Sequence, residues 1–446
     1  MEGVRKMLLC GAFIAGMVFG SPYMARNIQE ELHRTKPDYV VYVPRSMDGS
    51  TFDTGNEHFL VFDGPDGKLK AVWTQSTFEG QPDQRIVFSE SPDEGRTWTP
   101  PRVIAGPVPS AKGNMASWGF PMVTKSGRIY VIYNKHIGVN DVFTHTTGLM
   151  AGIYSDDGGK TWSSEQIIPM RRSKWDHPDK NIPANWIVWQ KPERLSEGKY
   201  FVGFTRWVSS AVRHPPPVNH WTACESVVEF MRFENLDEDP EVKDIRISWY
   251  ACDDAALRVG FPGHPEVSVV QEPSIVSLPD GRLFAVMRTA RGSPYYSVSK
   301  DHGRTWSQPD VLRYRDDGEP LLHPCSPCPI YAIGGGKYII LFHNHDGHFQ
   351  NFGPFDTLYH RRPIYIALGE YRQGARQPIW FSQPKFFMDN DGVPLGYGKG
   401  RADLAMYSSL TIRHGNIVLW YPDRKFFLLG KRITPEFLSD LRVPEG

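Results

Sequence analysis

The octet "SKDHGRTW", residues Ser299–Trp306, decides the fold because the chain repeats its spacing. The pattern Ser-x-Asp-x-Gly-x-Thr-Trp returns as "SPDEGRTW" at Ser91–Trp98 and as "SDDGGKTW" at Ser155–Trp162. In each copy the Asp side chain can accept backbone N–H bonds within a turn, and the Gly supplies a left-handed conformation. The Trp is expected to pack the turn onto its own sheet. The octet therefore predicts a repeated structural turn rather than a catalytic motif.

A wider repeat surrounds the octets. Six stretches have a turn glycine followed by a short apolar strand, and another apolar run precedes each of them. They are "DGKLKAVWTQ" at Gly67, "SGRIYVIYNK" at Gly127, "EGKYFVGFTR" at Gly198, "DGRLFAVMRT" at Gly281, "GGKYIILFHN" at Gly336 and "HGNIVLWYPD" at Gly415. Each stretch is typical of a β-hairpin whose turn needs a positive φ at glycine.

Six hairpins spaced by roughly 55 to 85 residues favour four-stranded blades over a solenoid, whose repeats are shorter and more regular. The sequence therefore predicts an all-β fold, a six-bladed β-propeller that forms one domain over residues 26–446. Each octet is expected to join the two outer strands of a blade. A degenerate fourth octet ends at Trp380.

The first 25 residues have the layout of a secretory signal peptide, with Arg5 and Lys6 before an apolar run from Met7 to Phe19. The run is short for a membrane span, although an uncleaved anchor is the alternative. We expect a secreted or periplasmic protein without a membrane span after cleavage. The formal net charge of zero gives no indication of a nucleic-acid partner.

Four cysteines follow the signal segment: Cys224, Cys252, Cys325 and Cys328. The last two form "CSPC", but no second pair follows at the spacing of zinc ligands. A disulfide or buried thiols are expected, and the sequence predicts neither a metal nor a cofactor there.

In a propeller the innermost strands converge on the axis, so residues at the same ends of these strands face one another. Eight or nine positions before the turn glycines lie His58, Trp118, Gln190, Glu272 and Tyr407, with Ser326 or Pro327 in the fifth hairpin. Seven or eight positions after them lie Gln75, Asn134, Arg206, Arg288, His343 and Asp423. Such a gathering of polar groups predicts a site at the axis.

The octet spacing is that of the Asp-box, and three copies on six hairpins resemble the sialidase superfamily. The fourth hairpin places Glu272 before its glycine and Arg288 after it, and the sixth begins with Tyr407 in "YSSLT", as in sialidases. The resemblance implies that Tyr407 is the nucleophile and Glu272 its base. A phenol with a pKa near 10 needs a carboxylate to take its proton. A neutral nucleophile also suits a substrate with a carboxylate on its anomeric carbon.

Sialidases bind the substrate carboxylate through three arginines, which give bidentate bonds to a planar anion. The resemblance assigns Arg288 as the second and Arg362, directly before "PIYIALG", as the third, in preference to Arg361. His58 occupies the place of the first, and a protonated imidazole there could bind an anion below a pKa near 6.5. Arg45 and Arg85 are the alternatives for this place.

A general acid is expected in the loop after the first hairpin, where Glu79 and Asp83 are both candidates. Further substrate contacts are expected from four positions on the rim and one in the second blade's loop: Trp118, Asn134, Gln190, Arg206 and His136. An insertion around 207–265 is expected to carry a loop over the rim, with Trp221 as a wall against a sugar ring.

Three function classes follow from these residues. The first is an exo-acting, sialidase-like glycoside hydrolase that releases a terminal anionic sugar with retention, so the expected partner is a glycan. The second is a polysaccharide lyase of the same superfamily, in which histidines such as His145 and His345 assist β-elimination on uronic acids. Those histidines could instead meet in a metal site. The third is a carbohydrate-binding propeller without catalysis.

Overall fold

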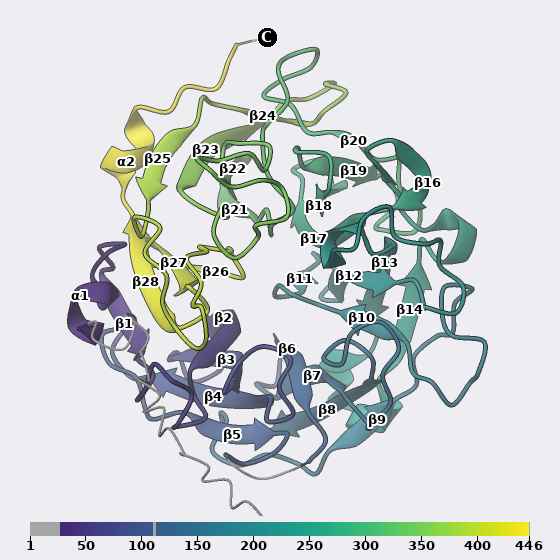
Figure 1. Cartoon of the computed structure of the whole chain (residues 1–446), viewed down its shortest axis with the longest axis vertical. Helices are drawn as coiled ribbons and strands as arrows, with labels where there is room; N and C mark the ends of the chain where they lie inside the picture. Colours follow the sequence, from purple (N-terminus) through teal and green to yellow (C-terminus); the bar gives the residue numbers. More distant parts are fainter. Residues whose placement is uncertain (1–26, 110–112, 446) are drawn as a thin grey trace, which may run out of the picture.

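Six antiparallel sheets surround a central axis in the computed structural model of the chain (Figure 1), which describes residues 27–109 and 113–445. The prediction of an all-β, six-bladed propeller is confirmed. The predicted signal peptide, residues 1–25, lies outside the described residues. Within the described part of the chain, no helix is long and apolar enough to cross a membrane.

The blades follow one another along the chain, each from its inner strand to its outer strand. The first contains β2 (Gly55–Asp63), β3 (Leu69–Ser76), β4 (Arg85–Ser91) and β5 (Arg102–Ala105). The second contains β6 (Ala116–Val123), β7 (Ile129–Lys135), β8 (Leu149–Ser155) and β9 (Gln166–Ile168). The third contains β10 (Asn185–Ile187), β11 (Glu193–Arg194), β12 (Tyr200–Trp207), β13 (Ser226–Phe233) and β14 (Ile247–Tyr250).

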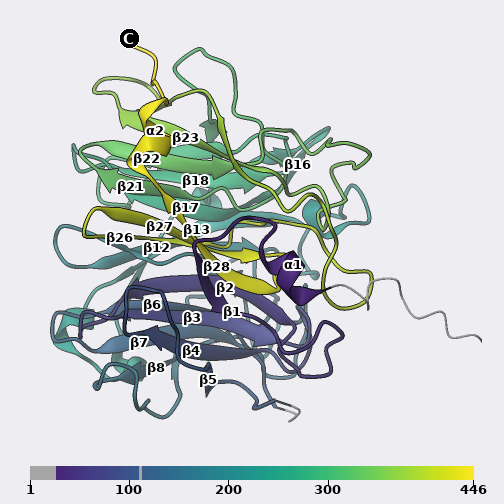
Figure 2. The same ribbon diagram turned by 90° about the vertical axis from the view of Figure 1, so that its left-hand side faces the viewer.

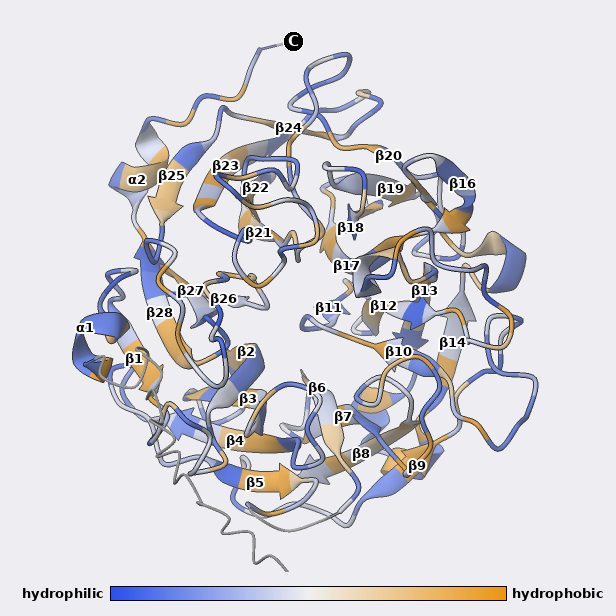
Figure 3. Ribbon diagram, in the orientation of Figure 1, coloured by the Kyte–Doolittle hydropathy of each residue, from blue (hydrophilic) through white to orange (hydrophobic). Residues whose placement is uncertain are grey.

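The fourth blade contains β17 (Val270–Ser277), β18 (Leu283–Thr289), β19 (Tyr295–Ser299) and β20 (Asp310–Val311). The fifth contains β21 (Ile330–Gly334), β22 (Lys337–Phe342), β23 (Ile364–Tyr371), β24 (Ile379–Phe381) and β25 (Lys385–Met388). A small ribbon of β15 (Gly260–Phe261) and β16 (His264–Ser268) lies between the third and fourth blades in the chain. Strongly hydrophobic segments lie on blade strands such as β4, β5 and β25 (Figure 3).

The sixth blade closes the ring with both ends of the chain. It contains β26 (Ser409–Arg413), β27 (Asn416–Asp423) and β28 (Phe427–Ile433), and its outer strand is the N-terminal β1 (Tyr39–Tyr42). The helix α1 (Ile28–Leu32) lies beside this blade (Figure 2), and α2 (Pro435–Ser439) follows it. Because β1 pairs with β28, the first and last strands of the propeller hold each other in place.

The six repeated glycines lie between the first and second strands of their blades, as the sequence predicts. Each has a positive φ, from 70° at Gly336 to 97° at Gly127. A side chain would strain these turns, because only glycine adopts this conformation without steric cost.

The three octets connect the third and fourth strands of their blades. In the copy at Ser299–Trp306, the Asp301 carboxylate accepts from the Thr305 backbone N–H and hydroxyl at 2.8 and 2.6 Å. The Trp306 indole N–H donates to the Gly303 carbonyl at 3.0 Å. These bonds confirm the structural turn.

The tryptophan of each octet contacts an aromatic ring of the preceding blade, a contact that the sequence did not predict. Trp306 stacks on Phe230 of the third blade at 4.1 Å between ring centroids. The other two copies repeat this contact, with Trp98 against Trp420 and Trp162 against Phe88. A Cβ added to Gly303 would lie 2.3 Å from Phe201 of the third blade. The octets therefore join neighbouring blades.

The stretch 207–265 contributes β13, β14 and β15 and a loop that reaches the axis. The loop carries Trp221 on a short 3-10 helix, Trp221–Ala223. All four cysteines in the described residues are free thiols, so the alternative of a disulfide is wrong.

Candidate active site

Three inner strands share one backbone irregularity. The pairing of β2, β6 and β17 with the second strand of each blade is interrupted at a bulge. At this bulge His58, Trp118 and Glu272 have φ values of 56°, 58° and 52°. Backbone strain of this kind is common at functional sites. The equivalent geometry shows why the three positions align in the sequence repeat.

The bulge is held by hydroxyls of the preceding blade. Thr74 of β3 accepts from the Trp118 backbone N–H at 3.0 Å, and Thr205 of β12 accepts from that of Glu272 at 2.7 Å. Because the preceding blade holds the strained backbone in place, the Cα of Glu272 has a fixed position beside the axis.

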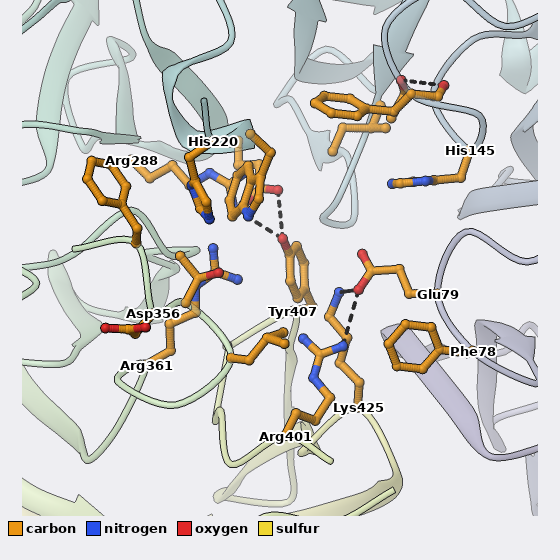
Figure 4. Close-up of a pocket in the computed structure, with 18 of the residues that line it drawn as sticks. Phe78, Glu79, His145, His220, Arg288, Asp356, Arg361, Arg401, Tyr407 and Lys425 are labelled. Carbon is orange, nitrogen blue, oxygen red and sulfur yellow. Dashed lines mark hydrogen bonds and ion pairs between the residues drawn. The ribbon is translucent and has the colours of Figure 1, made fainter. Parts of the chain in front are cut away.

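Tyr407 and Arg288 lie together at the cavity (Figure 4), and Glu272 contacts both of them. The Tyr407 hydroxyl donates to Glu272 Oε1 at 2.8 Å, and Arg288 Nη1 donates to the Tyr407 oxygen at 3.1 Å. Arg288 Nη1 also lies 2.5 Å from Glu272 Oε2. All three side chains are at least 96% buried. A base and a cation therefore both contact the phenol oxygen.

Burial changes the protonation of this group in a direction that suits proton transfer. It raises the pKa of Tyr407 to about 12, with the negative charge of Glu272 as the next cause. It also raises the pKa of Glu272 above its ordinary 4.5, although Arg288 opposes the change. The phenol is thus protonated at neutral pH, and the carboxylate beside it is a stronger base than usual.

Arg361 brings a second guanidinium to the cavity. Arg288 and Arg361 both contact the Trp221 ring, with each guanidinium carbon 5.2 Å from its centroid. Arg361 is 3% exposed and donates through Nη2 to the Cys325 carbonyl at 2.6 Å. Its Nε has no hydrogen-bond partner, and no carboxylate of the described chain forms an ion pair with it. A buried cation without a counter-ion beside a cavity is suited to bind an anion.

The opposite wall holds a network of paired charges. The Lys425 ammonium lies 2.6 Å from both Glu57 Oε2 and Glu79 Oε2. Arg401 contacts Glu79 at 3.2 Å and Asp403 at 2.6 Å. Burial would raise the pKa of Glu79, but Lys425 and Arg401 outweigh it and hold that pKa well below 4.5. Glu79 is therefore ionised at neutral pH in the free protein.

The cavity between these walls has a volume of about 570 Å³. This volume lies within the range of small-molecule sites, about 300–1,000 Å³. Its walls are largely aromatic and aliphatic, with Phe78, Trp118, Phe143, Ile187, Trp207 and Phe355 among the lining residues. The cavity therefore offers apolar surface for a sugar ring beside the guanidinium groups of Arg288 and Arg361.

Several residues singled out in the sequence line this one cavity: Tyr407, Glu272, Arg288, Glu79, Trp118, His145 and Trp221. Of the two acid candidates, only Glu79 faces it. Asp83 is wrong as a site residue, because its Oδ2 accepts from the Thr77 backbone N–H and hydroxyl at 2.8 and 2.7 Å. It shapes the loop that carries Glu79.

The choice of Arg362 over Arg361 is also wrong. The Arg362 guanidinium forms two hydrogen bonds with Asp389, at 2.8 and 2.5 Å, and does not line the cavity. The two arginines are neighbours in the chain, and their side chains take opposite roles, one paired and one without an ion-pair partner.

His58 lies at the predicted bulge but outside the cavity, in contact with the Trp118 ring at 5.1 Å between centroids. Burial lowers its pKa to about 3, so the imidazole is neutral and the anion-binding role is wrong. The arginines considered in its place also lie elsewhere, since Arg45 contacts Asp53 and Arg85 contacts Gln75.

Four other predicted contacts lie away from the cavity. Arg206 is buried in ion pairs with Asp176 and Glu229, at 2.7 and 3.0 Å. Asn134 donates to two backbone carbonyls, and His136 contacts a neighbouring loop residue. Gln190 lines a different cavity. These side chains form contacts within the blades, or they lie at the end of the inner strands away from the active-site cavity.

Sequence reasoning missed Arg401 and Lys425. Arg401 lies in the irregular segment between β25 and β26, where no repeat gives its position. Lys425 follows the rim position Asp423 by two residues, in the turn after β27, so that position could have drawn attention to it. Within the described residues, no group of three or more His, Cys, Asp or Glu side chains is placed to hold a metal ion.

Comparison with known proteins agrees with this architecture. Residues 67–345 match the BNR repeat-like domain, which is more than half of the chain. The chain belongs to this BNR repeat-like family. No curated protein sequence matches it significantly.

Solved structures similar to this BNR repeat protein include sialidases and trans-sialidases. The "Hadza microbial sialidase Hz136" is 16% identical with a TM-score of 0.57, and the match covers 86% of this chain and 66% of that one. The intramolecular trans-sialidase from Ruminococcus gnavus is 12% identical with a TM-score of 0.55, over 91% and 98% of the two chains. A Dyadobacter fermentans protein of unknown function is 14% identical with a TM-score of 0.54, over 89% and 97%. At these low identities the structural likeness shows a shared fold and nothing further.

Proposed function

We propose that this propeller is a glycoside hydrolase of the sialidase type, acting on a terminal sugar that carries a carboxylate. The contact of Tyr407 with both Glu272 and Arg288, beside Arg361, which forms no ion pair with any described residue, is the observation that carries the proposal. The substrate carboxylate binds Arg361 and Arg288 through charge-assisted hydrogen bonds, with the sugar ring against the aromatic walls. The location outside the cytoplasm stays a prediction from residues 1–25.

The reaction proceeds in two steps that retain configuration. Tyr407 Oη attacks the anomeric carbon while its proton passes to Glu272, and the bond from that carbon to the leaving oxygen breaks. Arg288 stabilises negative charge on the phenol oxygen. Glu79 in its protonated form donates a proton to the leaving oxygen. In the second step the Glu79 carboxylate takes a proton from water, the water oxygen attacks the anomeric carbon, and the bond from that carbon to Tyr407 breaks. Glu272 returns its proton to the Tyr407 oxygen.

Tyr407→Phe tests this function. The variant lacks the attacking oxygen but keeps the ring against Trp118 and Trp189. Loss of a nucleophile costs on the order of 10⁴-fold or more in kcat. We expect release of the anionic sugar from a sialoside or a related keto-acid glycoside to disappear while the thermal unfolding temperature stays close to wild type. Full turnover in the variant would exclude the mechanism.

A second candidate function is β-elimination on a uronic-acid polymer. The ionised Glu79 favours it, together with His145, whose pKa burial lowers. One of these bases would remove the proton next to the substrate carboxylate, a carbon–carbon double bond would form, and Tyr407 would protonate the leaving oxygen. The unsaturated product absorbs in the ultraviolet, whereas the hydrolase product does not. An ultraviolet-absorbing product from uronate polymers, with no product from keto-acid glycosides, would favour β-elimination over hydrolysis.

A further inference from the structure

A second cavity, of about 280 Å³, lies toward the other end of the inner strands. On β17, Glu272 lines the active-site cavity, whereas Ile275 and Val276 line the second one. The sixth blade shows the same order, because Tyr407 lines the first cavity and Leu410 lines the second. The two cavities are therefore separate and open near opposite ends of the strands around the axis.

Lys191 gives this cavity a cation. Its ammonium donates to the Leu410 carbonyl at 3.2 Å, and none of the ion pairs among the described residues includes it. Since an ammonium has three N–H donors, two stay without a protein acceptor. Burial lowers the pKa of Lys191 to about 8, with only partial opposition from Asp63 and Glu193.

Gln190 lines the same cavity, and only 6% of its surface is exposed. Its side-chain amide forms no hydrogen bond with any described residue. The donors and the acceptor of this amide are therefore available to a molecule in the cavity. The nearby Glu193 carboxylate is held on the wall by the Ser277 hydroxyl, which donates to it at 2.9 Å.

We propose that the second cavity binds a small organic carboxylate through the Lys191 ammonium and the Gln190 amide. An ammonium and an amide N–H are complementary to the two oxygens of such a group. Its carbon atoms would lie against the aliphatic side chains of Ile275, Ile330 and Ile412, which also line the cavity. The volume is just below that of pockets for drug-sized ligands, about 300–1,000 Å³, so the ligand is small. This site does not depend on activity at Tyr407.

Site-specific labelling tests the proposal on the full chain. Lysines are reductively methylated near pH 8 in propionate or in chloride of equal ionic strength, and peptide mass spectrometry measures each rate. We expect saturating propionate to slow methylation of Lys191 at least tenfold and to leave the exposed Lys300 unchanged. The readout distinguishes this cavity from propionate bound at Arg361. Equal Lys191 rates in the two salts would overturn the proposal.

Thermal unfolding gives an independent test that does not need a reactive Lys191. Propionate should raise the Tm of the wild type and of the control Lys300→Met more than chloride does, since a ligand of the folded state stabilises it. The additional rise should be clearly smaller in Lys191→Met and in Gln190→Leu than in the wild type, since only binding at Arg361 is left unchanged in these variants. An equal rise in Lys191→Met would assign the binding to another site, and no rise in the wild type would refute the carboxylate ligand.

Discussion

The outer turns and the inner bulges of the propeller both recur from blade to blade, but the turns conserve residues and backbone whereas the bulges conserve the backbone alone. At the outer turns the chain repeats residues as well as backbone. Each octet makes the same carboxylate bonds, as at Asp301, and the octets at Trp98 and Trp306 also make the same indole bond. At the inner bulges the backbone repeats within a few degrees of φ, whereas the residues are His58, Trp118 and Glu272.

This difference indicates that the outer turns have a structural role and that the inner bulges help to form the active site. A turn that joins neighbouring blades has the same task in every blade, so the same residues serve each time. The bulges have different tasks, because Trp118 and Glu272 line one asymmetric cavity and His58 packs against Trp118, so the three blades supply different groups. Changes at the bulges and the cavity should therefore affect turnover, and changes at the octets should affect stability.

The largest effect in this comparison is expected for Arg361→Met. Hydrogen bonds to charged groups contribute about 1.5–3 kcal/mol, so kcat/KM for an anionic glycoside should fall about 10- to 150-fold. The Tm should stay the same or rise, because a buried cation without an ion-pair partner is removed. Steady-state kinetics and thermal unfolding measure both effects.

The matched control is the neighbouring Arg362→Met. It removes the partner of Asp389 and should lower the Tm while kcat/KM stays near that of the wild type. If Arg362→Met lost the activity and Arg361→Met kept it, the assignment of the two arginines would be reversed.

Lys425→Met should shift the pH profile. The protonated form of Glu79 is the proton donor, so kcat/KM of the wild type falls as the pH rises above the lowered pKa of Glu79. Without the Lys425 ammonium that pKa rises, and the descending limb should move upward by about one pH unit or more. Profiles of kcat/KM for this variant and for Lys300→Met measure the shift. An identical limb in both variants would mean that Glu79 is not the acid.

A smaller effect, on stability alone, is expected at the octets. Gly303→Ala places a Cβ 2.3 Å from Phe201, whereas the equally left-handed Gly281 has open space around it. Overpacking costs about 1–3 kcal/mol, so Gly303→Ala should lower the Tm more than Gly281→Ala does. Both variants should keep the wild-type kcat/KM once folded. A loss of turnover in folded Gly303→Ala would contradict a purely structural octet.

The repeat made most of the fold predictable. Turn glycines such as Gly127 and Gly415 and the octets fix the number of blades and the alignment of inner strands, because these features depend on local backbone conformation. That alignment placed Glu272, Arg288 and Tyr407 at equivalent heights, and the structure brings them into contact.

The rest depended on contacts that no local pattern encodes. Arg361 and Arg362 are adjacent, and only the position of Asp389 decides which of them is paired. Arg206 follows its hairpin as Arg288 does, yet Asp176 and Glu229 neutralise it. Arg401 comes from an irregular segment without a repeat, so its place on the cavity wall follows from the tertiary fold alone.

Trapping the covalent intermediate tests the central claim most directly. Wild-type protein is mixed with an anionic glycoside, quenched in acid within one turnover and digested, and the peptides are analysed by mass spectrometry. The account predicts one added glycosyl group on the peptide that contains Tyr407, and none in Tyr407→Phe. Rapid product formation without any adduct, or an adduct on another residue, would contradict it.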